Sequence, residues 1–223
     1  MDNEKNKTTP LTEMKLNGKS NGQAATTSRL EVMKTYKLYV DGKFPRTESG
    51  RYYAFTDKNE QLIANICRSS RKDFRDAVVA ARKAQPGWAG KSAYNKGQIL
   101  YRIAEMLEGR RPQFVFELQQ QGSSAKEADA EVNMAIDRLV YYAGWTDKYQ
   151  QVFSSVNPVE SSHFNFSLPE PTGVVSVLSP EEFGLIGLVS VIAPAISGGN
   201  VVIVLASATK PLCAVTLDRK SVV

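Results

Sequence analysis

Residues 173–205 read GVVSVLSPEEFGLIGLVSVIAPAISGGNVVIVL. The segment begins with an apolar, β-branched run, residues 173–178, and ends with a second run, residues 201–205. A polar loop and an apolar segment of helical length lie between the two runs. Two continuous apolar strands around one helix form a βαβ unit, which begins a parallel sheet. We therefore predict an α/β fold.

The same region needs a test for membrane insertion, because residues 183–209 contain no charged side chain. A spanning helix needs about 20 consecutive apolar residues. Pro194 and the polar run 197–200 interrupt this segment near its middle. Two buried elements joined by a turn explain the pattern better, and we expect no membrane contact.

Strands and helices are predicted upstream of this unit. Alternating residues 36–40 precede Asp41-Gly42, a strong hairpin signal, and residues 51–55 and 62–67 are expected to form further strands. The first of four helices follows the capping pair Ser70 and Asp73, with a core face of Phe74, Ala77, Val78 and Ala81, and should end at Pro86-Gly87.

Three more helices have clear boundary signals. The second runs from about Ala93 to Gly109, and the third begins near Pro112 and ends near Gly122. A capping pair, Ser124 and Glu127, opens the long fourth helix. Beyond Asn157-Pro158, the alternation of Phe164 and Phe166 with polar residues predicts an extended ribbon.

Composition excludes several classes of protein. The net charge of +5 is spread over the chain, so we expect no nucleic-acid partner. The only two cysteines, Cys67 and Cys213, are far apart, and there is a single histidine, so we expect no metal site. Residues 1–33 are polar and are expected to form a disordered tail without a secretory signal, which favours a cytoplasmic location.

The turn after the first buried strand is where a dinucleotide usually binds in such sheets. Here that turn, residues 179–184, lacks the G-x-G-x-x-G pattern. The spacing alone therefore leaves nucleotide binding as one of several functions that this fold can carry.

Several motifs together resemble the aldehyde dehydrogenase superfamily from about residue 34 to residue 217. They are the N-terminal residues 39–44, the helix residues Ala77, Ala80, Ala81, Arg82, Ala84 and Trp88, the run Tyr141-Tyr142-Ala143-Gly144, and above all residues 170–180, EPTGVVSVLSP, followed by 192–195, 199–202 and 210–212.

This resemblance implies a partial Rossmann-like sheet preceded by a helical segment and N-terminal strands, with an oligomerisation ribbon around Phe164. It implies oxidation of an aldehyde to a carboxylic acid with NAD or NADP, through a cysteine nucleophile and a glutamate base. Partner subunits would be of the same family, in a homo- or hetero-oligomer. Because the family's cysteine and glutamate lie beyond position 223, we expect a chain cut off before them. Matching cofactor positions are Leu178, Ser179, Pro180, Leu205 and Ser207.

Two departures from the family pattern concern function. Glu182 stands where the family has an Asn that donates a hydrogen bond to the reaction's oxyanion, and an ionised carboxylate has no donor. Leu205 replaces a lysine that binds the adenosine ribose, and Ala208 replaces an acidic residue. Two hypotheses follow: an NAD(P)-dependent aldehyde dehydrogenase, or a non-catalytic member that oligomerises with an active copy and binds NAD weakly or not at all.

The last six residues, 218–223, do not continue the amphipathic helix expected after Pro211. They match a translated sequencing adapter. We interpret them as a non-native tail.

Overall fold

The structure is a computed structural model that describes residues 34–57 and 59–218, apart from the side chain of residue 218. The tail predicted for residues 1–33 lies outside the described residues, as does all but the first residue of the tail predicted for 218–223.

A three-stranded sheet opens the described chain. Its strands are β1 (Lys34–Tyr36), β2 (Tyr52–Thr56) and β3 (Leu62–Cys67), in the order β1-β3-β2. Strand β1 runs parallel to β3, and β2 runs antiparallel to it. The predicted strand over residues 36–40 is wrong. The hairpin expected at Asp41-Gly42 is present, with positive φ angles of 54° and 71° at these two residues. Val40 and Lys43 exchange two main-chain hydrogen bonds of 3.0 Å, and the Leu38 amide donates to the Pro45 carbonyl at 3.2 Å. This pairing is too short to form a strand, and Tyr36 pairs with β3.

Four helices follow, with bounds close to those predicted: α1 (Arg71–Ala89), α2 (Ala93–Glu108), α3 (Arg111–Gln120) and α4 (Ala125–Ala143). Both predicted capping boxes are present, at Ser70 with Asp73 and at Ser124 with Glu127. In each box the serine hydroxyl accepts from the third amide of the helix while the acidic side chain accepts from the serine amide.

Helix α1 departs from its prediction in two ways. It does not end at Pro86-Gly87 but continues to Ala89, because proline removes only one helical donor and the last turn is anchored elsewhere. The Trp88 indole Nε1 donates to the carbonyl of Ile196 at 3.0 Å. Phe74, predicted as a core residue, is 50% exposed, whereas Ala81 is buried as predicted.

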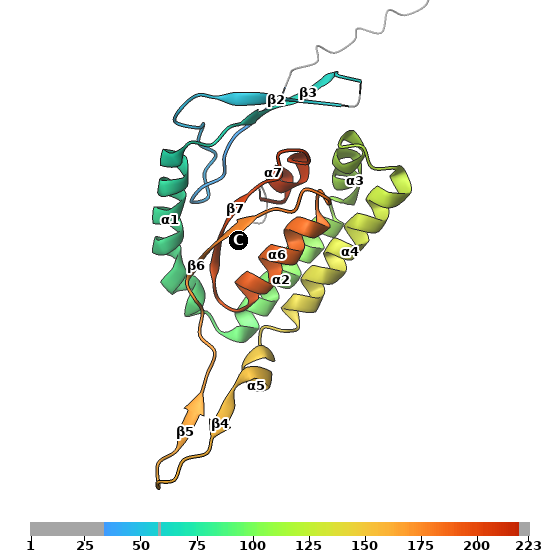
Figure 1. Ribbon diagram of the computed structural model, residues 1–223. Coiled ribbons are helices and arrows are strands. Elements are labelled where there is room, and N and C mark those ends of the chain that lie inside the picture. Colours follow the sequence, from blue (N-terminus) through green and yellow to red (C-terminus); the bar gives the residue numbers. More distant parts are fainter. Residues whose placement is uncertain (1–33, 58, 219–223) are drawn as a thin grey trace, which may run out of the picture. The chain divides into compact units, whose positions relative to one another are not determined.

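A short helix and a hairpin follow: α5 (Tyr149–Phe153), β4 (Ser155–Asn157) and β5 (Asn165–Ser167). Strands β4 and β5 pair antiparallel, with Val156 opposite Phe166. Figure 1 shows this hairpin extending away from the helices. The ribbon predicted around Phe164 is therefore present as a structural element.

The predicted βαβ unit consists of β6 (Val174–Leu178), α6 (Ile186–Ser197) and β7 (Val201–Leu205). The two strands pair in parallel, from Val174 opposite Val201 to Leu178 opposite Leu205. Helix α1 lies on one side of this pair and α6 on the other (Figure 1). Gly199, with a φ of 88°, makes the turn into β7. Asn200 then accepts from the Gly173 amide at 3.0 Å and donates to the Ala195 carbonyl at 3.0 Å, so it joins the start of β6 to the end of α6.

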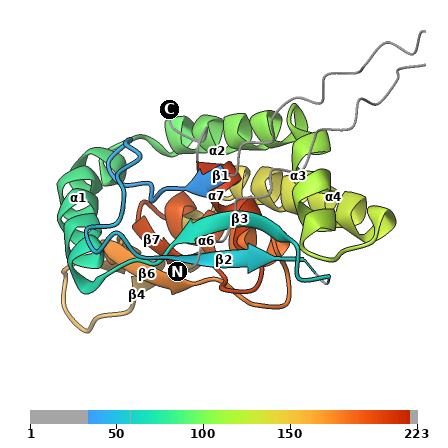
Figure 2. The ribbon, with the colours of Figure 1, turned by 90° about the horizontal axis from the view of Figure 1, so that it is seen from above.

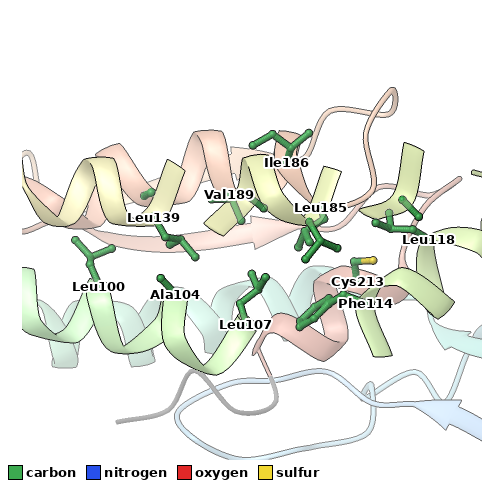
Figure 3. Packing of buried hydrophobic residues seen from close by; sticks show 14 residues of the cluster. Leu100, Ala104, Leu107, Phe114, Leu118, Leu139, Leu185, Ile186, Val189 and Cys213 are labelled. Atoms are coloured by element: carbon green, nitrogen blue, oxygen red, sulfur yellow. The ribbon is translucent and has the colours of Figure 1, made fainter. Parts of the chain in front are cut away.

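The main core lies between the helices and is shown in Figure 3. Side chains of α2, α3, α4 and α6 meet there, and those labelled in Figure 3 are Leu100, Ala104, Leu107, Phe114, Leu118, Leu139, Leu185, Ile186, Val189 and Cys213. A smaller cluster joins the three-stranded sheet to α7 (Leu212–Asp218) through Tyr36, Phe55, Ala64, Ile66 and Leu212. Figure 2 shows β2 and β3 lying over this part of the molecule.

Two carboxylates are buried among the helices, Glu117 of α3 and Glu131 of α4, and the second of them caps a neighbouring helix. Glu131 of α4 is 6% exposed, and its Oε1 accepts from the amides of Leu185 at 2.7 Å and Ile186 at 3.1 Å. These amides begin α6, whose N-cap residue Leu185 has no side-chain acceptor to offer. Glu131 therefore supplies from another helix the cap that the local sequence lacks.

Within the described part of the chain, no helix combines the length and apolar character needed to cross a lipid bilayer.

We predict that Glu131→Ala destabilises the protein. Two amides at the start of α6 would lose their acceptor in a buried place, and hydrogen bonds to a charged group contribute about 1.5–3 kcal/mol. The melting temperature should fall by roughly 4–10 °C, measured by differential scanning calorimetry. Asp137→Ala, an exposed position on the same helix, is the control and should leave the melting temperature within about 2 °C. Equal effects of the two substitutions would contradict the capping role.

Candidate functional site

The carboxyl ends of β6 and β7 lie side by side. The Ser179 amide donates to the Leu205 carbonyl at 2.9 Å, which extends the strand pairing by one residue. Leu178 and Leu205, the final residues of the two strands, are 76% and 57% exposed. In an open α/β sheet, ligands bind outside the carboxyl ends of the strands. The loops 179–184 and 206–210 that leave these ends therefore form the candidate site.

Glu181 joins the two loops. Its Oε2 accepts from the hydroxyls of Ser207 and Thr209, both at 2.5 Å, and from the Thr209 amide at 3.2 Å. Its Oε1 accepts from the Ala208 amide at 3.2 Å. One carboxylate thus receives four hydrogen bonds from three consecutive residues of the loop after β7.

These hydrogen bonds alter the acidity of Glu181. The Ser207 hydroxyl first, then the Thr209 hydroxyl and the loop amides, lower the pKa of Glu181 from 4.5 to about 2. Hydrogen bonds donated to a carboxylate favour its charged form. The nearby Tyr53 of β2 has a raised pKa, mainly because of burial and secondly because of the negative charge on Glu181. Glu181 is therefore a fixed negative charge at neutral pH.

Glu182, which occupies the position of the family's oxyanion donor, lies differently. Its side chain is exposed and makes no hydrogen bond or ion pair to any other described residue. Its main-chain carbonyl accepts from the Lys210 Nζ, which closes the loop from the other side. The sequence directed attention to Glu182, but the polar contacts at the strand ends belong to its neighbour Glu181.

The other predicted cofactor positions surround this contact. Ser179 and Pro180 are half-buried at the end of β6, and Ser207 is 2% exposed. The Ser207 Oγ accepts from the Lys210 amide at 2.9 Å, which holds the hydroxyl in place while it donates to Glu181. The structure thus brings Leu178, Ser179, Leu205 and Ser207 together.

These residues do not fit a dinucleotide as they stand. Leu205 has no group that could hydrogen-bond a ribose hydroxyl, and the donors at residues 207–209 are already bound to Glu181. Glu131 likewise occupies the first amides of α6. The sequence alone did not identify Glu131 or Glu181 as part of the site. Their hydrogen-bond donors lie far away along the chain, and the residues around each glutamate give no sign of them.

A cavity of about 330 Å³ lies elsewhere, between α1 and the amino end of β6. Its lining comprises Arg82, Gln85, Thr172, Gly173 and Val174. It is at the opposite end of β6 from the loops described above, where the βαβ architecture places no ligand. We therefore assign the candidate site to the strand ends and not to this cavity.

Neither cysteine is placed as a nucleophile. Cys213 lies in the helical core, where burial and, secondly, the charge of Glu117 raise the pKa of its thiol. A thiol with a raised pKa is a poor nucleophile at neutral pH. Cys67 is the last residue of β3, in the three-stranded sheet of β1, β2 and β3. Among the described residues, no group of three or more His, Cys, Asp or Glu side chains is arranged to hold a metal ion.

Comparison with known proteins agrees with this architecture. The model of the aldehyde dehydrogenase family matches residues 45–219. The chain is 31% identical over 189 residues to the D-glyceraldehyde dehydrogenase (NADP(+)) of Thermoplasma acidophilum, covering 83% of this chain and 38% of that protein. It is 30% identical over 194 residues to retinal dehydrogenase 2 of Gallus gallus, covering 84% of this chain and 37% of that protein.

Solved structures show the same fold. The crystal structure of PnpE in complex with nicotinamide adenine dinucleotide aligns with a TM-score of 0.80 and 25% identity, covering 83% of this chain and 38% of that chain. This chain belongs to the aldehyde dehydrogenase family. It spans less than two fifths of the length of the relatives named here.

We predict that Glu181→Gln loses an acid-sensitive contribution to stability. A carboxyl group whose pKa is lowered on folding stabilises the fold above its unfolded pKa, near 4.5, and loses that contribution as pH falls towards about 2. Urea unfolding at several pH values should therefore show the wild type more stable than the variant at pH 6, with the difference shrinking between pH 4.5 and 2. Glu182→Gln is the control, and a pH-independent difference for Glu181→Gln would refute the assignment.

Proposed function

We propose that this chain works in an oxidoreductase of the aldehyde dehydrogenase type, which oxidises an aldehyde to a carboxylic acid with NAD or NADP. Family membership supports the reaction type. The NADP(+) in the name of the Thermoplasma relative and the dinucleotide bound to PnpE support the cofactor class.

Within that assembly we assign this chain a non-catalytic role, in which it associates with subunits of the same family. The observation that carries this assignment is the contact of Glu181 with residues 207–209, which uses the polar donors at the strand ends. The exposed Leu205 supports it, because an aliphatic side chain offers a ribose no hydrogen bond. The two free cysteines support a reducing, cytoplasmic location.

A second candidate function is direct NAD(P)-dependent oxidation by the polypeptide that contains this chain. The parallel βαβ unit, with β6 and β7 in register over five residue pairs, favours it because this is the frame on which the family binds its cofactor. Under either candidate, the substrate of the whole assembly is an aldehyde of small-molecule size.

The hairpin of β4 and β5 supports association with other subunits. Val156, Phe164 and Phe166 are 69%, 74% and 60% exposed, and the two phenyl rings lie 5.6 Å apart. Contiguous exposed apolar side chains of this kind mark protein–protein contact surfaces. A second subunit of the family is the partner that we propose for this surface.

Titration with NADH separates the two candidate functions. We expect the full-length polypeptide that contains this chain to show no saturable quenching of its tryptophan fluorescence up to about 1 mM NADH, since the donors at the strand ends are occupied. A catalytic relative titrated in parallel is the positive control. A dissociation constant in the micromolar range would contradict the non-catalytic assignment and favour direct oxidation.

The proposed association is tested by changing the hairpin. The double substitution Phe164→Ser and Phe166→Ser should lower the molar mass in solution from that of an oligomer to that of a monomer, measured by light scattering after size exclusion. Phe74→Ser is the control, because Phe74 is a half-exposed phenylalanine on α1. A monomeric wild type, or an unchanged mass in the double variant, would contradict the hairpin's role.

A further inference from the structure

Two carboxylates of the protein itself accept hydrogen bonds from main-chain amides of the βαβ unit and the loop that follows it. Glu131 accepts from the first amides of α6, and Glu181 accepts from amides and hydroxyls of the loop after β7. Amides at helix starts and in tight loops are the groups with which proteins bind phosphates and other anions. In this chain, both sets of amides already have an anion that belongs to the protein.

The two carboxylates differ in how firmly they are held. Glu131 is 6% exposed and lies between α4 and α6 in the helical core, so it cannot leave without unfolding its surroundings. Glu181 is exposed on a loop whose neighbours Glu182 and Phe183 are exposed as well. Because the Glu181 side chain lies at the surface and is held by hydrogen bonds to residues 207–209, its contact is the reversible one.

The receiving loop is shaped independently of Glu181. The Ser207 Oγ accepts from the amides of Lys210 at 2.9 Å and Thr209 at 3.2 Å, and Ser207 is 2% exposed. The loop would therefore keep its form when the carboxylate leaves. It would then present the Ala208 amide and the hydroxyls of Ser207 and Thr209, whose oxygens lie 3.2 Å apart, to an external acceptor.

We propose that Glu181 is an internal latch: its carboxylate closes an anion site formed by residues 207–209, and a phosphate group can bind there only after Glu181 withdraws. The latch would regulate the same strand ends to which we assign the candidate site. It rests on the proposed function in one respect only, namely that the phosphate would come from a dinucleotide. The latch excludes an external phosphate in two ways, by occupying the donors and by placing a negative charge beside them.

The contact also ties two loops together. Glu181 follows β6 and residues 207–209 follow β7, so the latch spans the two strand ends. Lys210 adds a second connection through the carbonyl of Glu182. Opening the latch should therefore loosen the loop 179–184 while the strands themselves, which are paired along their whole length, stay in place.

The test compares the full chain with Glu181→Ala, using inorganic phosphate, NAD and NADP as separate probes. Binding is measured by isothermal titration calorimetry and by the shift in melting temperature, against sodium chloride of equal ionic strength. We expect at least a tenfold tighter dissociation constant for inorganic phosphate in the variant than in the wild type. Adding Ser207→Ala to Glu181→Ala should abolish that gain, because it removes the buried hydroxyl donor.

Two further variants make the result interpretable. Glu182→Ala removes the same charge one residue away and should leave phosphate binding at the wild-type level, since Glu182 does not contact residues 207–209. Glu181→Gln removes the charge while keeping the side chain's size, so it gives a second measurement if the alanine variant is unstable. An equal gain in Glu181→Ala and Glu182→Ala, or equal phosphate binding by wild type and Glu181→Ala, would overturn the latch.

The dinucleotide probes distinguish failure of the latch from failure of the proposed function. If Glu181→Ala gains affinity for phosphate but not for NAD or NADP, the latch is supported and the dinucleotide is excluded as its ligand. If the wild type binds inorganic phosphate as tightly as Glu181→Ala does, the latch is overturned, whereas participation in an aldehyde-oxidising assembly is unaffected.

Discussion

The hydrogen bonds from the start of α6 to Glu131 set the position of the whole βαβ unit. Helix α6 is apolar along its length and begins at Leu185 without a local cap, so its first amides need acceptors from elsewhere. Glu131 provides them from α4, within a core that excludes water. Because both amides share one carboxylate oxygen, the start of α6 is fixed against α4, and the loop 179–184 that enters α6 is fixed with it.

A second carboxylate acts on the other side of that loop. Glu181 receives four hydrogen bonds from residues 207–209 and remains charged at neutral pH, because those bonds lower its pKa to about 2. Strands β6 and β7 and helix α6 thus form the βαβ frame expected for the family. The donors at the carboxyl end of β7 are hydrogen-bonded to a side chain of the same chain, Glu181. The hydrogen bonds that stabilise this frame therefore include groups at the strand ends, where the sheets of this fold class bind ligands.

Much of the architecture could be predicted from local patterns. The bounds of β3 and β7, both capping boxes and the parallel pairing of β6 with β7 follow from apolar runs, serine caps and the length of the crossover. The prediction that α1 ends at Pro86 was wrong because the Trp88 contact with Ile196 lies 108 residues away along the chain. The strand predicted over residues 36–40 was wrong, since of these residues only Tyr36 belongs to a strand, paired with β3, although the hairpin turn at Asp41-Gly42 is present.

The sequence by itself determined most of the elements, their order and the family, since each depends on neighbouring residues and on motifs read along the chain, whereas the short elements β1 and α5 were not predicted. It also showed that Glu182 and Leu205 depart from the family pattern. Only the tertiary structure decided that Glu181 binds residues 207–209 and that Glu131 caps α6, contacts that span 26–28 and 54–55 residues. The periodicity of the sequence indicates whether a side chain is buried or lies in a loop. It does not identify the hydrogen-bond partner of that side chain, because the partner must lie nearby in space and the packing of the helices determines which distant residues become neighbours.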